Sequence, residues 1–566
     1  MEVRRSERRG LAWLLLAAMC FFGLFAHGYV ENGDAEMTMH AARAWWRTGD
    51  PGLQQEGPTT TLAERTIAGW IHTPGPPDFG MVGTNGRAYV WFPIGHQALM
   101  VPCVAAGESL ARAFPAPEAE LRRLKGEAFG ELFWSRFLCS LLPIPFAAGT
   151  VVLVFLLARS LGLSSREALR VTLAATLCTA FWPGSSETMS DTPGTFFLLG
   201  AVVAVFVFHA AAGRGEGAVV PMLLGGASAG AAVLVRYPHA ASVMVLTAGA
   251  AWVAWRAGRW RELLAFAVAG LPFAVALLAA NWLRFASLTE TGYSAGATKE
   301  WFSYPPWLGG ALILAAPGKG ILWFSPVLWP ALAQLLRRAT WRCAWPVLVA
   351  LGCAGVPIAI SAHTAGWAAG QCWSVRYVTP GVVLLVTVLL AVGRPWRRRP
   401  RLFAAACALG ALVSLGGVLT PYRGDRNLAY HATRAAYPDR SEGELPMIWD
   451  FEPRFSPIKS HWIYAWLSLT GRLEVGGSAN TTEPLFGVRV DDGAKPLRPS
   501  QVEDRGFRHW WWRYGAGLFG WPRWPAAVLA LGAALAAALA WRRLGGRKGG
   551  APLHSGRQAA DITGGS

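Results

Sequence analysis

Apolar stretches long enough to cross a membrane alternate with short polar connections along most of this 566-residue chain. A helix needs about 20 apolar residues to cross the hydrocarbon core. Stretches that meet or approach this length lie near 11–25, 133–158, 170–183, 194–212, 218–235, 240–256, 262–281, 318–336, 344–361, 377–393, 402–420 and 525–541. The pattern predicts an all-α polytopic membrane protein with about twelve transmembrane helices.

Composition supports this class. Hydrophobic residues make up 53% of the chain and charged residues only 15%, whereas a soluble protein carries about 25% charged residues. The 29 Trp, 64 Gly and 37 Pro are typical of membrane interiors and their interfaces. Soluble multidomain, disordered and fibrous proteins are therefore excluded. The eight cysteines include no CxxC spacing and lie mostly in apolar runs, so we interpret them as buried apolar residues.

The formal net charge is +18, and the basic residues gather in short connections between apolar runs. These clusters lie at 4–9, 159–170, 256–261, 337–342, 394–401 and 542–548. They follow the rule that cytoplasmic loops are rich in Lys and Arg, so no nucleic-acid partner is expected. We expect a plasma (inner) membrane protein with both termini in the cytoplasm. If 92–112 also spanned, later clusters would move outside, so we interpret it as interfacial or re-entrant.

This topology divides the chain into a membrane domain and an outer module. The predicted units are a transmembrane domain at 1–420 with the outer loop 28–132, an extracytoplasmic module at 421–524, a last transmembrane helix at 525–544, and a disordered cytoplasmic tail at 545–566. The stretch 471–493 has a strand-like pattern, so we expect the module to be β-rich.

Acidic residues are rare near the predicted spans, which makes those at the outer ends the first candidates for chemistry. Asp34 and Glu36 follow the first span, and Asp191 precedes a helix that we expect to start at Pro193. Residues 37–47 have the period of an amphipathic helix on the outer surface. A simpler interpretation is that each Asp caps a helix. Two acids at the outer ends of different spans could nonetheless face one cavity.

Cations on the outer side, against the positive-inside bias, are Arg236, Arg284, Lys319 and Arg376. They could hold a phosphate by charge-assisted hydrogen bonds or extend to lipid headgroups. No GxxxxGK(S/T), GxGxxG or HExxH motif occurs, so no nucleotide cradle or zinc protease site is predicted. A phosphate-linked substrate used outside would then be carried by a membrane lipid. His40, His96 and His363 have no metal-site spacing and leave a divalent metal open.

The segment 34–50, D-A-E-M-T-M-H-A-A-R-A-W-W-R-T-G-D, resembles the first outer loop of the C-type (GT-C) glycosyltransferases. In the aminoarabinose lipid A transferases and protein O-mannosyltransferases this loop runs D-E-x-x-Y-x-x-x-x-R, followed by G-D. Asp34, Arg43 and Asp50 keep that spacing, although Glu does not directly follow Asp34 and Met holds the Tyr place. The stretch 190–197 resembles D-x-x-L-T-F-F. The segments 281–293, 317–327 and 366–380 resemble motifs of uncharacterised bacterial members.

The resemblance implies a GT-C-like fold and the inverting transfer of a hexosyl or pentosyl group from a polyprenyl-phosphate carrier to an acceptor hydroxyl on the extracytoplasmic side. It implies Asp34 as general base and Asp191 as its support. The implied substrate-binding residues are Glu36, Arg43, Arg236, Arg284, Lys319, His363 and Arg376, with Arg236, Lys319 and Arg376 on the leaving lipid phosphate. The implied acceptor is a lipid, glycan or protein among membrane lipids.

Two other functions remain open at this point. A transporter or flippase for lipid-linked sugars or polysaccharides would also place cations at headgroup depth. It predicts charged groups within several spans, whereas these apolar runs are clean and show no internal repeat. A scaffold for envelope assembly would leave the pairing of Asp34 with Arg43 in the motif unexplained.

Overall fold

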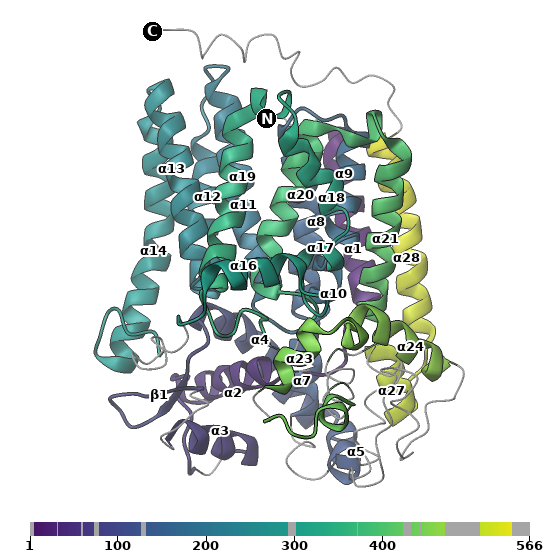
Figure 1. The fold of residues 1–566 in the computed structure, drawn as a ribbon. Coiled ribbons are helices and arrows are strands. Elements are labelled where there is room, and N and C mark those ends of the chain that lie inside the picture. Colours follow the sequence, from purple (N-terminus) through teal and green to yellow (C-terminus); the bar gives the residue numbers. More distant parts are fainter. Residues whose placement is uncertain are drawn as a thin grey trace.

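The structure is a computed structural model. It describes the chain except residues 1–4, 31, 58–59, 73–78, 126–131, 293–301, 371, 421, 423–428, 430–431, 442–443, 470–509 and 546–566. The described part is a bundle of long helices with a layer of shorter helices across one end (Figure 1). The predicted all-α membrane fold is confirmed.

Among the described residues, nine helical segments are long and apolar enough to cross a membrane. They are formed by α1 (Arg5–Phe25), α7 and α8 (Phe133–Leu141 and Pro143–Ser160), α11 (Asp191–Ala212), α13 (His239–Ala257), α14 (Trp260–Phe285), α19 (Ala344–Ala362), α20 (Thr379–Gly393), α21 (Pro400–Leu419) and α28 (Trp524–Ala540). Charged residues of these segments lie within a few residues of their ends. Their middles therefore carry only uncharged side chains, as a hydrocarbon environment requires.

Three other predicted spans are built from shorter helices. The span at 218–235 is α12 (Val219–Val235), and the span at 170–183 is divided between α9 (Ser165–Leu177) and α10 (Phe181–Gly184). The prediction of one continuous helix over 318–336 is wrong. This segment contains α17 (Ile321–Phe324) and α18 (Leu328–Leu332), preceded by α16 (Pro306–Ala315). Pro326 lies in the gap between α17 and α18, where its missing backbone N–H and its ring interrupt the helix, whereas Pro330 lies in the first turn of α18 and is tolerated there.

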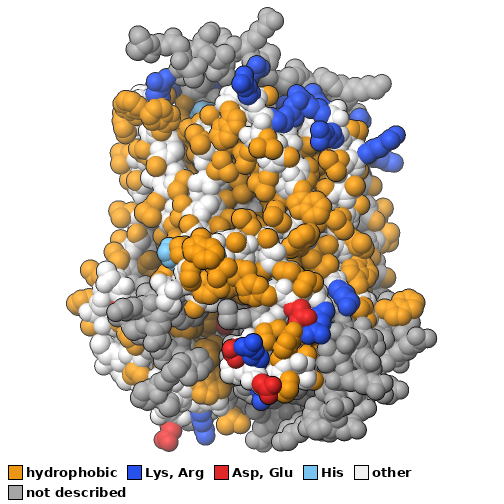
Figure 2. Space-filling view, in the orientation of Figure 1, with side chains coloured by type: hydrophobic (Ala, Val, Ile, Leu, Met, Phe, Trp, Pro, Cys, Tyr) orange, Lys and Arg blue, Asp and Glu red, His pale blue; other side chains and the backbone are white. Residues whose placement is uncertain are grey.

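Several basic connections meet at one end of the bundle. Arg159, in the last turn of α8, pairs with Glu7 of α1 at 3.2 Å, and Arg397, before α21, pairs with Glu167 of α9 at 2.7 Å. Arg166 donates to the carbonyl of Gly545, beyond α28. Lys and Arg side chains gather at this end on the face seen in Figure 2. The starts of α1, α9 and α21 and the end of α28 thus share one end, as the positive-inside pattern predicts.

The centre of the bundle is α20, which is buried along nearly its whole length. It packs on α8, α9, α18 and α19. A Cβ on Gly381 would lie 2.8 Å from the Cα of Ala354, so α20 and α19 touch backbone to backbone at this point. By contrast, α14 is at the edge and exposes Leu264, Leu271 and Leu278 on one stripe. Such a stripe at helical spacing is suited to contact with lipid tails.

The outer layer is formed mainly by the first outer loop. It contains α2 (Gly33–Thr48), α3 (Leu62–His72), α4 (Ile94–Ala113) and α5 (Ala116–Lys125), with an antiparallel pair of strands, β1 (Gly80–Val82) and β2 (Ala88–Val90), in register at Met81 and Tyr89. Helix α2 lies across the end of the bundle (Figure 1), and α4 packs against α2 and α7. The outer module contributes α23 (Leu445–Phe451), α24 (Pro457–Leu469) and α27 (Trp511–Phe519). The β-rich prediction for 471–493 lies outside the described residues, as does most of the predicted tail.

Candidate active site

Two carboxylate–arginine pairs lie where the outer layer meets the bundle. Arg376 Nη2 donates to Asp34 Oδ2 at 2.7 Å. Arg236 Nη1 lies 2.8 Å from Asp191 Oδ1 and also donates to Ser190 Oγ at 3.3 Å. The four charged residues come from four distant parts of the chain, so only the folded bundle brings them together.

The ring of Tyr377 connects the two pairs. The guanidinium carbon of Arg236 lies 5.0 Å from the ring centroid and that of Arg376 lies 5.4 Å from it. Both distances are within the range of cation–π attraction. The charge of Arg376 also interacts with both Asp34 and Asp191. The two acids selected from the sequence therefore belong to one cluster, which we call the paired-charge cluster: Asp34, Asp191, Arg236, Arg376 and Tyr377.

Helix ends position these side chains. Asn32 caps α2 by accepting a hydrogen bond from Ala35 N at 3.0 Å, which leaves Asp34 in the first turn with its carboxylate available. The capping interpretation of Asp34 is thus wrong. Asp191 starts α11, two residues before the predicted start at Pro193, and Arg236 ends α12. Carboxylates in the first turns of α2 and α11 are favoured by the partial positive charge of a helix N-terminus.

Exposure distinguishes the two acids. The side chains of Asp191 and Arg236 are 7% and 8% exposed, and that of Arg376 is 13% exposed. The Asp34 side chain is 37% exposed. Asp34 is therefore the carboxylate that a molecule arriving from the surrounding solvent can reach, whereas Asp191 is enclosed.

A narrow pocket lies beside the cluster. Its lining residues are Phe181, Gly184, Glu187, Met189, Asp191, Thr192, Thr195, Trp373, Arg376 and Thr379. Within the described part of the chain, Asp191 Oδ2, Trp373 Nε1 and Arg376 Nε are buried and have no hydrogen-bond partner. Buried polar atoms in native proteins are nearly always satisfied, so this group indicates a place for water or a polar ligand.

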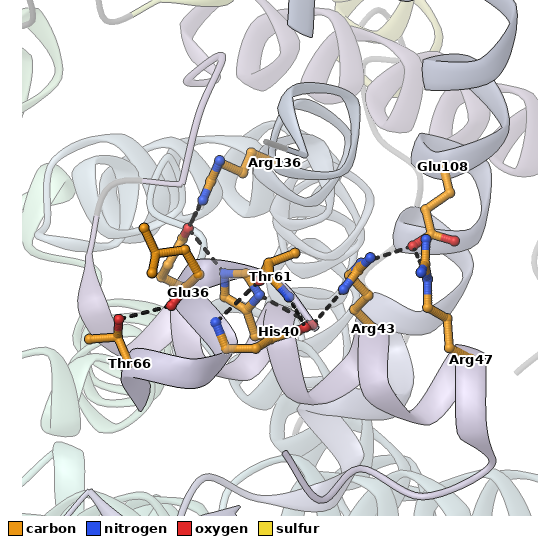
Figure 3. A network of polar contacts seen from close by, with 10 residues as sticks. Glu36, His40, Arg43, Arg47, Thr61, Thr66, Glu108 and Arg136 are labelled. Carbon is orange, nitrogen blue, oxygen red and sulfur yellow. Dashed lines mark hydrogen bonds and ion pairs between the residues drawn. The ribbon is translucent and has the colours of Figure 1, made fainter. Parts of the chain in front are cut away.

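Glu36 and Arg43 belong to a second cluster (Figure 3). Glu36 Oε1 accepts a hydrogen bond from Arg136 Nε of α7 at 2.7 Å and lies 3.5 Å from His40 Nε2. His40 Nδ1 lies 3.6 Å from Glu64 Oε1 of α3, which also accepts from Arg43 Nη1 at 2.7 Å. We call Glu36, His40, Arg43, Glu64 and Arg136 the histidine clamp.

The clamp continues into α4, because Arg43 and Arg47 both donate to Glu108 Oε1, at 2.9 and 2.7 Å. It therefore holds α2 against three other helices. Arg43 and Glu36, which the family resemblance implied as substrate-binding, contact protein charges here.

Opposite charges shift the protonation of the clamp. Burial alone would raise the pKa of Glu36, but Arg136 and His40 lower it to about 2. Burial would likewise raise the pKa of Glu64, but hydrogen bonding and charge from His40, with Arg43, lower it to about 2. Burial would lower the pKa of His40, but the two carboxylates raise it above its ordinary value. The favoured state is an imidazolium between two carboxylates.

Lys319 is buried apart from the paired-charge cluster. Its Nζ donates to the carbonyls of Gly370 and Cys372, each at 2.7 Å, and lies 4.7 Å from the ring centroid of Tyr422. These contacts fix the turn that precedes Trp373 and Arg376. Lys319 therefore shapes the approach to the cluster, and its described contacts are all with protein groups.

Arg284 and His363 also lie elsewhere. Arg284 Nη2 donates to Asn281 Oδ1 at 2.8 Å, its guanidinium lies over Phe285, and its carbonyl accepts from Thr84 N at 3.1 Å. It joins the end of α14 to the β1–β2 hairpin. The His363 side chain is exposed, and its carbonyl accepts from Tyr304 N at 3.0 Å. Within the described ranges, no group of three or more His, Cys, Asp or Glu residues could hold a metal ion.

Sequence reasoning did not select Tyr377, Met189 or Glu64, and it named His40 only among the histidines available for a metal. Tyr377 directly follows Arg376 in the segment 366–380, so its signal was present beside a selected residue. The sequence held no comparable signal for the pairing of His40 with Glu64, because that contact depends on how α3 packs on α2.

Comparison with solved structures finds similarity to two proteins at low sequence identity. ArnT from Cupriavidus metallidurans bound to undecaprenyl phosphate is 13% identical, with 95% of this chain and 77% of that chain covered and a TM-score of 0.43. The oligosaccharyltransferase AglB from Archaeoglobus fulgidus, in complex with an inhibitory peptide and a dolichol-phosphate, is 12% identical, with 78% and 59% covered and a TM-score of 0.38. No family model matches the sequence, and no curated protein does.

Proposed function

We propose that this protein is a membrane glycosyltransferase that moves a sugar from a polyprenyl-phosphate carrier to an acceptor hydroxyl, with Asp34 as general base. The observation that carries the proposal is the paired-charge cluster. It combines one partly exposed carboxylate, one enclosed carboxylate and two arginines at the outer end of the bundle. A base, a supporting acid and two cations for a phosphate are the groups that this reaction requires.

The proposed step is a single displacement. The Asp34 carboxylate takes the proton of the acceptor hydroxyl, and the hydroxyl oxygen bonds to the anomeric carbon. The bond from that carbon to the phosphate oxygen breaks, and the lipid phosphate leaves with the electron pair. Because attack and departure occur on opposite faces of the sugar, the configuration inverts. Arg376 and Arg236 would stabilise the negative charge that develops on the phosphate.

The proposed location is the plasma (inner) membrane, with both termini cytoplasmic and the cluster on the extracytoplasmic side. The basic ends of α1, α9 and α21 share the end of the bundle opposite the outer layer, and such ends normally face the cytoplasm. The donor is a hexosyl or pentosyl polyprenyl phosphate. The acceptor is a lipid, glycan or protein hydroxyl, and we propose that the module 421–524 contributes to its selection.

A carrier for lipid-linked sugars is less well supported. Transport through a bundle requires polar or charged groups along its interior. In the nine long segments the charges lie near the ends, and α20 at the centre is packed with apolar residues such as Leu384, Val386 and Leu389. The paired-charge cluster and the histidine clamp both lie at the end of the bundle that the outer layer covers, which suits chemistry at the membrane surface.

The test is transfer of a labelled sugar from polyprenyl phosphate by purified protein in detergent. Asp34→Asn should lower kcat by roughly 10²–10⁴-fold, the usual contribution of a general base. Glu216→Gln is the matched control, because Glu216 is exposed in the connection between α11 and α12, at the end of the bundle opposite the cluster. If folded Asp34→Asn transfers normally, the base is assigned wrongly. If the wild type neither binds polyprenyl phosphate nor transfers sugar, the enzyme proposal fails.

A further inference from the structure

The buried guanidinium of Arg376 has few acceptors. A guanidinium carries five N–H donors. In the described structure its hydrogen bonds go to one carboxylate oxygen of Asp34, at 2.7 Å, and to the thioether of Met189. A thioether sulfur is a weak acceptor, and Arg376 Nε has no partner. Arg376 is therefore held in place by Asp34 with donor capacity to spare.

The two pairs of the cluster also balance in charge. Asp34 and Asp191 offset Arg376 and Arg236, so a phosphate that enters meets no excess cation unless one pair opens. The Asp191–Arg236 pair is enclosed on both sides. Asp34 is 37% exposed and stands in the first turn of α2, outside the bundle. The Asp34–Arg376 pair is the one that can separate without exposing a buried carboxylate.

The same contact engages both groups that the reaction needs. Arg376 Nη2 occupies Oδ2 of the Asp34 carboxylate, which an acceptor hydroxyl would have to approach. The charge of Asp34 also offsets that of Arg376, so a phosphate meets a neutral pair rather than a cation. One event would relieve both conditions, namely transfer of Arg376 from the carboxylate to an incoming phosphate.

We propose that Arg376 is exchanged between two anions: it is the counter-ion of Asp34 in the donor-free protein and the partner of the donor phosphate once the donor is bound. This inference rests on the proposed function. The exchange frees Asp34 Oδ2 for the acceptor hydroxyl only when a lipid-linked donor occupies the site. It also makes Asp34 and the phosphate compete for Arg376. Removing the charge of Asp34 should therefore tighten phosphate binding.

The test is a double-mutant cycle on the binding of undecaprenyl phosphate to purified protein in detergent. Asp34→Asn should tighten binding about tenfold, equivalent to about 1.4 kcal/mol, because Arg376 no longer has to leave a carboxylate. In the Arg376→Gln background the same change should have no effect. Size-exclusion profiles check that each variant is folded. If Arg376→Gln does not fold, Arg376→Lys replaces it, and Asp34→Asn should then tighten binding by less than tenfold.

Each other outcome has a distinct meaning. Unchanged or weaker binding by Asp34→Asn overturns the exchange. Equal tightening with and without Arg376 also overturns it, because the effect would then be general repulsion between Asp34 and the phosphate. If the wild type binds undecaprenyl phosphate and transfers sugar but the cycle shows no coupling, the exchange alone fails. Absence of both binding and transfer in the wild type removes the proposed function together with the exchange.

Discussion

Replacing His40 by glutamine should destabilise the outer layer. The His40 side chain is fully buried between the carboxylates of Glu36 and Glu64. Glutamine is uncharged, so the variant leaves two carboxylates facing one another without the cation between them. Because Glu36 and Glu64 stand on α2 and α3, the loss acts on the contact between these helices.

The magnitude follows from the partners that remain. Removing one member of a buried charge pair costs about 3–5 kcal/mol when the other is left alone. In the variant Glu36 still pairs with Arg136, and Glu64 still pairs with Arg43. We therefore expect a loss of about 2–3 kcal/mol, below the full cost of an unpaired charge. Asp34 stands two residues before Glu36, so transfer activity should fall as well.

The assay is thermal unfolding in detergent, followed by tryptophan fluorescence between pH 5.5 and 9. Burial is outweighed by Glu36 and Glu64, which raise the pKa of His40 above its ordinary 6.5. Its contribution is therefore complete below about pH 6.5 and is lost as pH rises through the raised pKa. The difference in Tm between wild type and His40→Gln should be largest at pH 5.5 and should shrink at alkaline pH.

A matched control is His72→Gln, since His72 lies on α3 outside the clamp and should change Tm little at any pH. A Tm difference for His40→Gln that is constant across the pH range would refute the reasoning. Such a result would mean that His40 contributes through packing rather than through charge.

Three further predictions concern acid, an aromatic ring and a helix cap. Burial would raise the pKa of Glu36 and Glu64, but neighbouring cations outweigh it and lower each pKa from 4.5 to about 2. Stability should therefore be lost as pH falls from 4.5 towards 2. Glu64→Gln should flatten this part of the profile of Tm against pH. Tyr377→Leu should weaken undecaprenyl-phosphate binding severalfold, because each cation–π contact is worth about 0.5–2 kcal/mol. Tyr377→Phe keeps the ring and should bind within twofold of wild type. Equal losses of affinity in the two variants would contradict the cation–π role of the ring. Asn32→Ala should destabilise the protein by about 1 kcal/mol through loss of the α2 cap, and Asn32→Asp should restore it; a Tm unchanged in Asn32→Ala would show that the cap is dispensable.

The membrane fold could be predicted because it depends on local composition. Each long helix is an apolar run of adequate length, and that property is visible without knowing its neighbours. The break at 318–336 was also present in the sequence, as Pro326, but the apolar average of the run concealed it. Run length therefore predicts a crossing more reliably than it predicts a continuous helix.

The candidate site could be predicted only as a set of charges at outer helix ends. Arg236, Arg376, Lys319 and Arg284 share that sequence feature, yet only two of them meet the acids. The difference depends on partners that are distant in the chain, such as Asp34 and Arg376, which are 342 positions apart. Side-chain direction at a helix end depends on those partners and not on local pattern.

The close crossing of α19 and α20 links the interior of the bundle to substrate handling. Gly381 follows Arg376 by five residues, and a side chain there would meet the Ala354 backbone at 2.8 Å. Because α20 is enclosed by other helices, a larger residue at this crossing would shift its outer tip and carry the guanidinium with it. Natural variants that change only the bulk of this apolar crossing would then differ in affinity for the lipid carrier, even with every charged side chain unaltered.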